Sequence, residues 1–580
     1  MSASVDFSKP TQKKPFLTNF WQKIRKPDLQ KSSSQRQVRG MQSEVSTPSS
    51  LPFSAKLGIL LFHLGLTFTA LPAISAERVY VNFGPLQFAF SVASLETFAK
   101  EGRIESDLRL FVNYVDAQQR EQLRELLITP VDLTPVAVSQ FFYSPQGEAL
   151  LRQAGGLIQT RAGQSGFYAL RAAMIKAAAS EEGFTPLNIL KQFPTAGILL
   201  NTSRGFELLD QLGEVTQETA RVSQIIEQQS LSEVTATFPV PNFGQLPNLQ
   251  DRGVYNFTRE TLQITDFRRN RVFPVDLYIP EMQGEGKIPV VVISHGLGSD
   301  RNTFAYLAQH LASYGFAVAV PEHPGSNAEQ IEALTRGLVN EITPPRELLD
   351  RPLDIQYLLE ALGSTSAYQN LNFRGVGVIG QSFGAYTALA LAGANLNFEK
   401  LQRECATLEN TLNISLLLQC DALKIPPLNY NLRSDRVKAV IAISPLASRI
   451  FGQSGLSEIS IPTMIVSGSN DTVTPALPEQ IRPFTWLTHP EKYLVLLKGG
   501  THFSTLAEES GSVPLPAQAI GPNPTIAKGY MEALSTAFFK TYIAEEPEYR
   551  DYLNAPYAQV LSQDSIPLFL VESLSAEQIP

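Results

Sequence analysis

Short apolar runs alternate with amphipathic stretches between residues 253 and 545. The apolar runs are nearly continuous in Val, Ile, Leu and Ala, as in strands buried on both faces of a sheet. Between them, apolar residues recur three and four positions apart, as on one face of a helix. This alternation predicts an α/β fold with a doubly wound, mostly parallel sheet. The apolar runs lie within 288–296, 316–323, 375–382, 437–445, 461–471 and 493–502. Two alternating strands joined by a polar turn, within 255–266 and 271–280, precede them, and helical stretches lie within 304–315, 351–363 and 385–393.

A different pattern precedes this domain. From residue 77 to 235 apolar residues recur mostly at helical spacing, with Gly or Pro between segments, after one possible short strand at RVYVNFG. We therefore expect a separate, mainly helical domain over 77–235. Residues 236–252 are rich in Pro, Asn and Gly and read as a linker, and 546–580 are expected to form a C-terminal tail.

The first 76 residues read as a leader and an export segment. Residues 1–56 have no apolar period and are expected to be disordered, whereas 57–76 carry no charged side chain and end in small residues, with Ala73 and Ser75 or Ala76 near a cleavage point. The same stretch is long enough for an uncleaved membrane anchor. We expect the protein to be exported to the periplasm or the extracellular space, and possible membrane association to run through 57–76. A start at Met41 gives a leader of ordinary length.

Charge and cysteine content restrict the ligands that the protein is expected to bind. Residues 1–56 hold ten Lys or Arg against three Asp or Glu, while the rest of the chain holds 37 against 52. An acidic body argues against nucleic-acid binding. Cys405 and Cys420 form either a local disulfide or two buried thiols. No spacing typical of a metal site is found among the six histidines and two cysteines, and we expect no cofactor.

A candidate nucleophile lies in GVIGQSFGAYTAL, residues 377–389. Ser382 stands in a G-x-S-x-G motif where a buried strand passes into a helix. A nucleophile elbow needs this arrangement, because glycines at 380 and 384 permit a strained turn that projects the hydroxyl above the sheet. The location of the motif, more than the motif alone, predicts that Ser382 is a nucleophile.

A serine hydroxyl also needs a base and an orienting carboxylate. Asp471 and His502 each follow a predicted strand, so both are expected at the same sheet edge as Ser382. Their order along the chain, Ser then Asp then His, is that of the α/β-hydrolases. The backbone N–H groups of Phe383 and Leu297 are the predicted oxyanion-hole donors, Leu297 lying in the glycine-rich loop HGLGSD after the first central strand.

These stretches together resemble the α/β-hydrolase superfamily. The likeness rests on HGLGSDRNTFAYLAQHLASYGFAVAVPEHPGS, RPLDIQYLLEAL, GVIGQSFGAYTAL, SGSNDTVTP and GGTHFS, covers about residues 255–545, and is nearest to the dienelactone hydrolase and platelet-activating-factor acetylhydrolase branch. The resemblance implies Ser382 as nucleophile, His502 as base, Asp471 as its partner, and Leu297 and Phe383 as oxyanion donors. The acetylhydrolases carry their acid after an earlier strand, whereas IAISPLAS here has no carboxylate.

Two further segments stand out in this comparison. Residues 394–434 are longer than a minimal connection and are a possible cap. The 77–235 region resembles a domain of unknown function that precedes predicted hydrolases in some exported bacterial proteins, which assigns it no activity.

We expect the other polar residues near the predicted site to support the structure and not to take part in catalysis. His295 is expected to brace the oxyanion loop, Glu322 and His323 to form structural hydrogen bonds, and Arg351 and Asp354 to tie a helix start to a neighbouring loop. The sequence thus predicts a serine esterase or lipase acting on a small or lipid ester. The alternative is a noncatalytic envelope protein that uses the hydrolase fold as a scaffold for interaction.

Overall fold

The computed structural model describes residues 75–112, 116–237, 239–284, 286–406, 411–507 and 517–579. The basic leader, Met41 and nearly all of the 57–76 segment lie outside these residues, so the expectations placed on them stay predictions. Within the described ranges, no helix has the length and apolar character needed to cross a membrane. The chain divides into two compact units, the first formed by residues up to 133 together with 154–209, and the second by 134–153 together with 210–580.

The first unit contains a four-stranded sheet as well as helices, so the expectation of a mainly helical region needs correction. Its strand order is β2-β1-β4-β3, with β1 antiparallel to β2 and parallel to β4. Only β1 was anticipated, and the short β3 and β4 carry too few residues to display a period of two. The strands are β1 Arg78–Phe83, β2 Leu86–Ser91, β3 Ile158–Thr160 and β4 Gly197–Leu200, and the helices are α2 Val92–Glu101, α3 Arg109–Val112, α4 Ala117–Ile128, α7 Phe167–Ala178 and α8 Pro186–Lys191.

Local sequence signals set the helix ends in this unit. Ser91 caps α2 by accepting a hydrogen bond from the backbone of Ser94, and Gly102 ends the helix with φ of 73°. A capping box at Asp116 begins α4. These side chains satisfy N–H groups that have no partner inside the first helical turn.

The boundary between the two units differs from the one expected at residue 235. Helix α5 (Pro135–Tyr143), the first part of α6 (Pro145–Leu157) and the long helix α9 (Thr202–Ala236) from Asp210 onward group with the second unit. The reason is burial, because Val222 and Ile226 of α9 are fully inaccessible within the core of the second unit. Helical spacing identifies such a helix but does not reveal which core its apolar face joins.

A nine-stranded sheet forms the centre of the second unit, in the order β13-β12-β11-β10-β9-β7-β8-β6-β5. The six strands from β12 to β8 are parallel, as predicted, and the strands at both edges pair antiparallel. The chain steps from β7 outward to β8 and then back to β9 on the other side, which makes a topological switch point beside β7. The strands are β5 Phe257–Asp266, β6 Arg271–Pro280, β7 Ile288–Ser294, β8 Ala317–Pro321, β9 Leu371–Gln381, β10 Val437–Ile443, β11 Thr463–Gly468, β12 Lys492–Leu497 and β13 Leu568–Val571.

The C-terminal segment is part of this domain and not a tail. Strand β13 pairs antiparallel with β12, and Leu568, Leu570 and Val571 are buried. Helix α20 (Ala555–Leu561) precedes it. A strand of four residues carries too weak a pattern to be read from the sequence.

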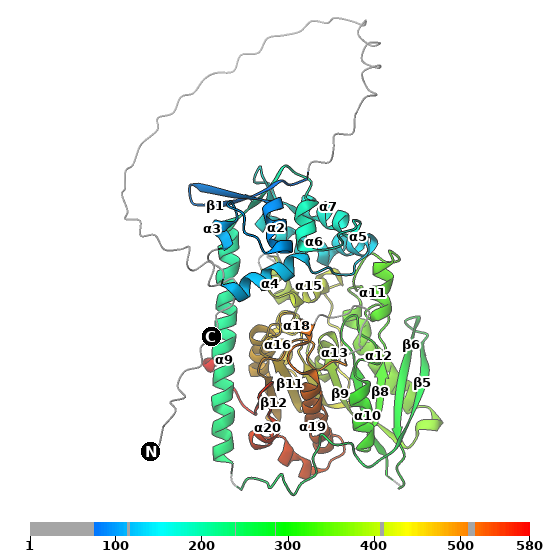
Figure 1. Ribbon diagram of the computed structural model, residues 1–580. Coiled ribbons are helices and arrows are strands. Elements are labelled where there is room, and N and C mark those ends of the chain that lie inside the picture. Colours follow the sequence, from blue (N-terminus) through cyan, green and yellow to red (C-terminus); the bar gives the residue numbers. More distant parts are fainter. Residues whose placement is uncertain are drawn as a thin grey trace, which may run out of the picture. The chain divides into compact units, whose positions relative to one another are not determined.

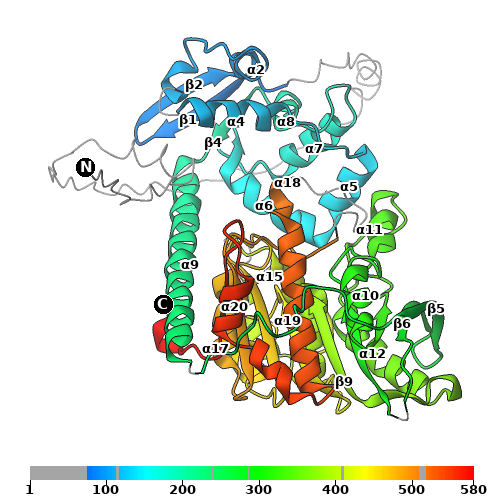
Figure 2. The same ribbon diagram turned by 60° about the horizontal axis from the view of Figure 1, so that its bottom comes forward.

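Helices cover both faces of the sheet (Figures 1 and 2). Side chains of β7 alternate between two cores, Val290 and Val292 facing the one that α12 and α13 complete, and Val291 and Ile293 facing the one that α10 and α19 complete. The second unit's helices are α10 Ala305–Ser313, α11 Ala328–Thr335, α12 Glu347–Gly363, α13 Phe383–Ala392, α14 Phe398–Glu404, α15 Ser415–Gln419, α16 Gly452–Leu456, α17 Arg482–Trp486, α18 Ala517–Ile520 and α19 Pro524–Tyr542, with the π-helical turn η4 Leu477–Ile481.

Candidate active site

Ser382 occupies a strained turn between β9 and α13. Its φ is 56° and its ψ is −115°, a backbone conformation that a residue with a Cβ atom rarely adopts. The Ser382 N–H donates to the carbonyl of Ile443 at the end of β10, at 2.9 Å. Strain of this kind persists only where the surroundings hold it, and it clusters at functional sites.

The two glycines that flank the serine are required by close backbone packing. A Cβ atom at Gly384 would lie 2.0 Å from the carbonyl oxygen of Ser294 in β7, and one at Gly380 would lie 2.1 Å from the carbonyl oxygen of Gly384. Neither neighbour can move, because both are backbone atoms in regular elements. The G-x-S-x-G spacing is thus explained by the packing of β7, β9 and α13 around the turn.

Asp471 and His502 lie together at the carboxyl ends of β11 and β12. His502 Nδ1 is 2.8 Å from Asp471 Oδ2, and the two side chains are almost completely buried. Gly468 and Gly500 allow the two loops to approach, since a Cβ atom at Gly468 would lie 2.6 Å from the Gly500 carbonyl oxygen. The structure therefore joins the predicted acid and base, which are 31 residues apart in sequence.

Five donors surround the Asp471 carboxylate. The N–H groups of Val473 and Thr474 donate to Oδ1 at 2.9 and 2.8 Å, while Oδ2 accepts from His502, from the Thr474 hydroxyl and from Gln480 Nε2. Burial acts to raise the pKa of Asp471, but His502 and the hydrogen bonds outweigh burial and lower it. The carboxylate is held ionised and fixed in orientation.

Gln381 connects the base to the elbow. Its side-chain Nε2 donates to the backbone carbonyl of His502 at 3.1 Å, from the position next to Ser382. No hydrogen bond joins the Ser382 hydroxyl to His502 within the described residues, and in ligand-free hydrolases such contacts are often long. Ser382 is 8% exposed and His502 is 4% exposed, so the reacting groups are shielded from bulk water.

The two predicted oxyanion donors come from the loop after β7 and the start of α13. In the part of the chain that the structure describes, the N–H groups of Leu297 and Phe383 donate to no protein acceptor. Gly296 is pressed against Gln381, whose Oε1 would lie 2.4 Å from an added Cβ atom. Gly298 takes φ of 71° and donates its N–H to the Ser326 carbonyl. These contacts hold the loop against the residue that precedes the nucleophile.

Two protein-family models match parts of this chain. The family model described as "Alpha/beta hydrolase of unknown function (DUF1400)" matches residues 75–201. The model for platelet-activating factor acetylhydrolase, isoform II, matches residues 273–343, which run from β6 past α11 and include the oxyanion loop. The chain belongs to the α/β-hydrolase superfamily. No curated protein matches it.

Behind the oxyanion loop this hydrolase buries a polar network. His295 Nε2 accepts the backbone N–H of His323 at 3.0 Å, so Nδ1 carries the proton and donates to the Gly296 carbonyl at 2.7 Å. Burial, followed by the charge of Arg351, lowers the pKa of His295 well below its ordinary value. A neutral His295 therefore braces the loop that carries Leu297.

The same network contains a second Ser, His and Asp set. Ser294 Oγ donates to His323 Nε2 at 3.0 Å, and His323 Nδ1 donates to Asp354 Oδ2 at 3.0 Å. All three side chains are fully inaccessible. Asp354 also pairs with Arg271 of β6, at 2.8 Å. With no access for a substrate, this set joins α12 to the central strands and has a structural role.

Arg351 is the largest fully buried side chain among the residues that the structure describes. Its guanidinium carbon lies 4.4 Å from the centroid of the Phe383 ring, and Nη2 donates to the carbonyl of His295. Burial lowers the pKa of Arg351 to about 9, while Glu347 and Asp354 act in the opposite direction, so the side chain stays charged at neutral pH. It contacts Phe383, one predicted oxyanion donor, and His295, which lies two residues before Leu297, the other.

The 394–434 segment contains a disulfide between Cys405 and Cys420, which resolves the two alternatives left by the sequence. The loop closed by this bond reaches the acid loop, where the Ser415 N–H donates to the Val473 carbonyl at 3.1 Å. Gln146 of α6 donates to Asp421, next to the disulfide. The segment thus lies against the loop that carries Asp471, and its role as a cap stays a prediction.

Residues that sequence reasoning missed surround the acid. Thr474, Gln480 and Gln381 all contact Asp471 or His502, yet their neutral side chains give no signal in the sequence that separates them from other buried amides and hydroxyls. Glu479, also fully buried, accepts the N–H groups of Ala447 and Ser448 at 2.9 Å each. A carboxylate thus reaches the IAISPLAS loop from the π-helical turn η4.

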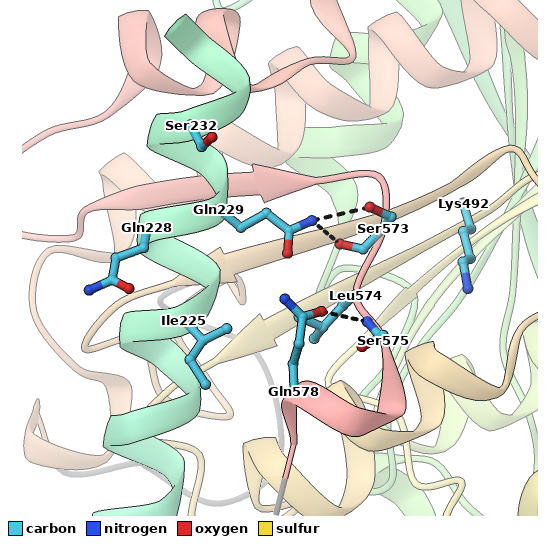
Figure 3. Close-up of a pocket in the computed structure, with 9 residues that line it drawn as sticks. All are labelled: Ile225, Gln228, Gln229, Ser232, Lys492, Ser573, Leu574, Ser575 and Gln578. Atoms are coloured by element: carbon cyan, nitrogen blue, oxygen red, sulfur yellow. Dashed lines mark hydrogen bonds between the residues drawn. The ribbon is translucent and has the colours of Figure 1, made fainter. Parts of the chain in front are cut away.

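A pocket of about 660 Å³ lies away from the triad, between α9 and the segment after β13 (Figure 3). Two of its polar side chains are already engaged, because Gln229 Nε2 donates to the Ser573 hydroxyl at 3.1 Å and Lys492 Nζ donates to the Leu487 carbonyl at 2.7 Å. None of the predicted catalytic residues lines it. We assign it no ligand.

Proposed function

We propose that the protein is a serine hydrolase that cleaves carboxylic esters, as an esterase or a lipase. The observation that carries the proposal is the hydrogen bond between Asp471 and His502 at the same sheet edge as the strained Ser382. The match to an acetylhydrolase model over 273–343 supports hydrolase chemistry on an ester. The identity of the acyl chain and of the alcohol is left open by this proposal.

In the proposed mechanism, His502 takes the proton of Ser382 as the oxygen attacks the ester carbonyl. Asp471 holds the imidazole and stabilises the imidazolium that forms. The N–H groups of Leu297 and Phe383 donate hydrogen bonds to the carbonyl oxygen as negative charge develops on it, each donor lowering the barrier by about 3 kcal/mol. His502 then protonates the leaving alcohol, and water activated by the same imidazole releases the acid from Ser382.

We propose further that the enzyme acts outside the cytoplasm. Two observations support this location: the uncharged 57–76 segment after Lys56, and the Cys405–Cys420 disulfide, which persists in oxidising compartments. Residues 57–76 serve as a cleaved signal or as an anchor. In either case the substrate is an ester present in the envelope or the medium.

Hydrolysis of p-nitrophenyl esters of increasing acyl length tests this function. The full-length protein is compared with Ser382→Ala, and kcat/KM is measured for each ester. Turnover that disappears in Ser382→Ala identifies the nucleophile, and the preferred chain length separates esterase from lipase. Equal rates in the two folded proteins would contradict the proposal and favour a noncatalytic interaction role.

A further inference from the structure

The π-helical turn η4 follows the acid loop and places two adjacent side chains in the site. The N–H of Arg482 donates to the carbonyl of Leu477, five residues earlier, which is the hydrogen bond of a π turn. Glu479 and Gln480 within this turn are both fully buried. Glu479 contacts the loop after β10, whereas Gln480 contacts the loop after β11.

Gln480 directs its amide donor at the catalytic acid. Its Nε2 lies 2.9 Å from Asp471 Oδ2, 2.5 Å from the Thr474 carbonyl oxygen and 3.1 Å from Thr474 Oγ1. Among the residues that the structure describes, its Oε1 has no hydrogen-bond partner. Leaving a buried acceptor unpaired is unfavourable, and an apolar side chain of similar size avoids that penalty. The polar contacts of Gln480 are therefore those of its amide donor, to Asp471 and Thr474.

The contact fixes which oxygen of Asp471 faces the base. Oδ1 is held by the N–H groups of Val473 and Thr474, and Oδ2 is shared by His502 and Gln480. Rotation of the carboxylate breaks all of these bonds together. The amide is neutral, so it orients Asp471 without adding charge beside His502, and Glu479 turns its own charge toward Ala447 and Ser448.

We propose that Gln480 is a positioning residue for the Asp471 carboxylate, acting through it on His502 and Ser382. This inference rests on the proposed triad. Without the amide donor, Asp471 populates orientations in which Oδ2 no longer faces His502 Nδ1, and the imidazole loses its fixed ring position.

The test uses the full-length protein and a fluorophosphonate probe, whose reaction needs the triad but not the natural substrate. Ser382 Oγ forms a bond to phosphorus, fluoride leaves, and the proton passes to His502. The rate of labelling is measured for wild type, Ser382→Ala, Gln480→Met, Gln480→Glu and a control, Gln419→Met, from about pH 5 to about pH 9. Gln419 is also a fully buried glutamine, but its contacts are with Arg449, Ile450 and Ser415.

We expect Gln480→Met to label about 10-fold to 100-fold more slowly than wild type at every pH, because a hydrogen bond to a charged group is lost. Relative to wild type at the same pH, Gln480→Glu should be least impaired at low pH, where a proton shared between the two carboxyl groups lets the introduced carboxyl donate to Asp471, and its deficit should grow as pH rises and the two carboxylates repel. The rate of Gln419→Met should instead keep a constant ratio to the wild-type rate across the pH range.

Three results would overturn the inference: a wild-type rate in Gln480→Met, a wild-type pH profile in Gln480→Glu, or an equal loss in Gln419→Met. If Gln480→Met fails to fold, the pH profile of the near-isosteric Gln480→Glu alone tests whether Gln480 positions Asp471. Wild type that is labelled no faster than Ser382→Ala would refute the triad itself, and with it the role of Gln480.

Discussion

The Arg351 guanidinium carbon lies 4.4 Å from the centroid of the Phe383 ring, and Arg351 also donates to the carbonyl of His295. One buried cation thus joins the start of α13 to the loop after β7. Because these two segments carry the N–H groups proposed to bind the oxyanion, their separation depends on Arg351.

Replacing Arg351 with Met should lower kcat of ester hydrolysis by about 10-fold to 100-fold, since a buried charged donor contributes roughly 1.5–3 kcal/mol. KM should change little, because the donors act most strongly in the transition state. Steady-state kinetics beside the exposed-arginine control Arg550→Met check this. A wild-type kcat in a folded Arg351→Met protein would contradict it.

Gly384→Ala should destabilise the protein by at least about 1–3 kcal/mol, because the new Cβ atom would lie 2.0 Å from the Ser294 carbonyl oxygen. Gly286→Ala is the matched control, since no atom lies within 4 Å of its added Cβ. Urea unfolding measures both. Similar midpoints for the two variants would show that β7 and α13 do not pack as described.

Acid should destabilise the protein through His310. Burial lowers the pKa of His310 to about 4, and Nε2 donates to the Leu249 carbonyl at 3.0 Å. The histidine of the unfolded chain takes up a proton near its ordinary pKa of 6.5 but that of the folded chain does not, so stability is complete above pH 6.5 and falls as the pH drops toward 4. The expected contribution is about 2–3 kcal/mol near the lower end.

His310→Gln keeps an N–H for Leu249 and removes the titration. Its free energy of unfolding, measured by urea at neutral and at acidic pH, should therefore change less with pH than that of wild type. His295 and His323 also have pKa values lowered by burial, so a shallower slope is expected and not a flat one. Identical slopes for variant and wild type would refute the role of His310.

Reduction of the Cys405–Cys420 disulfide should destabilise the protein by about 3 kcal/mol, the loop-closure value for fifteen residues. Wild type should therefore unfold at lower urea with a reductant present. The double variant Cys405→Ser, Cys420→Ser should have that lower stability without reductant, and adding reductant should not change it. If the reductant lowered the stability of both proteins equally, the effect could not come from this disulfide and the prediction would be wrong.

Much of the second unit follows from local pattern. Apolar runs without polar interruption identify the parallel strands, since both of their faces are covered, and the amphipathic stretches between them identify α10, α12 and α13. Strand β13 is not predicted, because its four residues are too few to show a pattern of apolar and polar positions. The boundary at 235 was misplaced because an apolar helix face does not specify its partner.

The candidate site divides in the same way. Ser382 could be recognised because its requirements are local: a strand, a tight turn with glycines at 380 and 384, and a helix. Asp471 and His502 could be placed at strand ends by the same reasoning, although the sequence does not give the distance between their side chains.

By itself, the sequence determined the parallel sheet, the elbow at Ser382 and the sheet edge at which Asp471 and His502 lie, because neighbouring residues and strand ends encode these features. Only the tertiary structure decided that Asp471 Oδ2 meets His502, that Gln480 and Thr474 share that oxygen, and that Arg351 lies between His295 and Phe383. Such contacts join distant segments through neutral or buried side chains, and their energies depend on burial and geometry that no local pattern records.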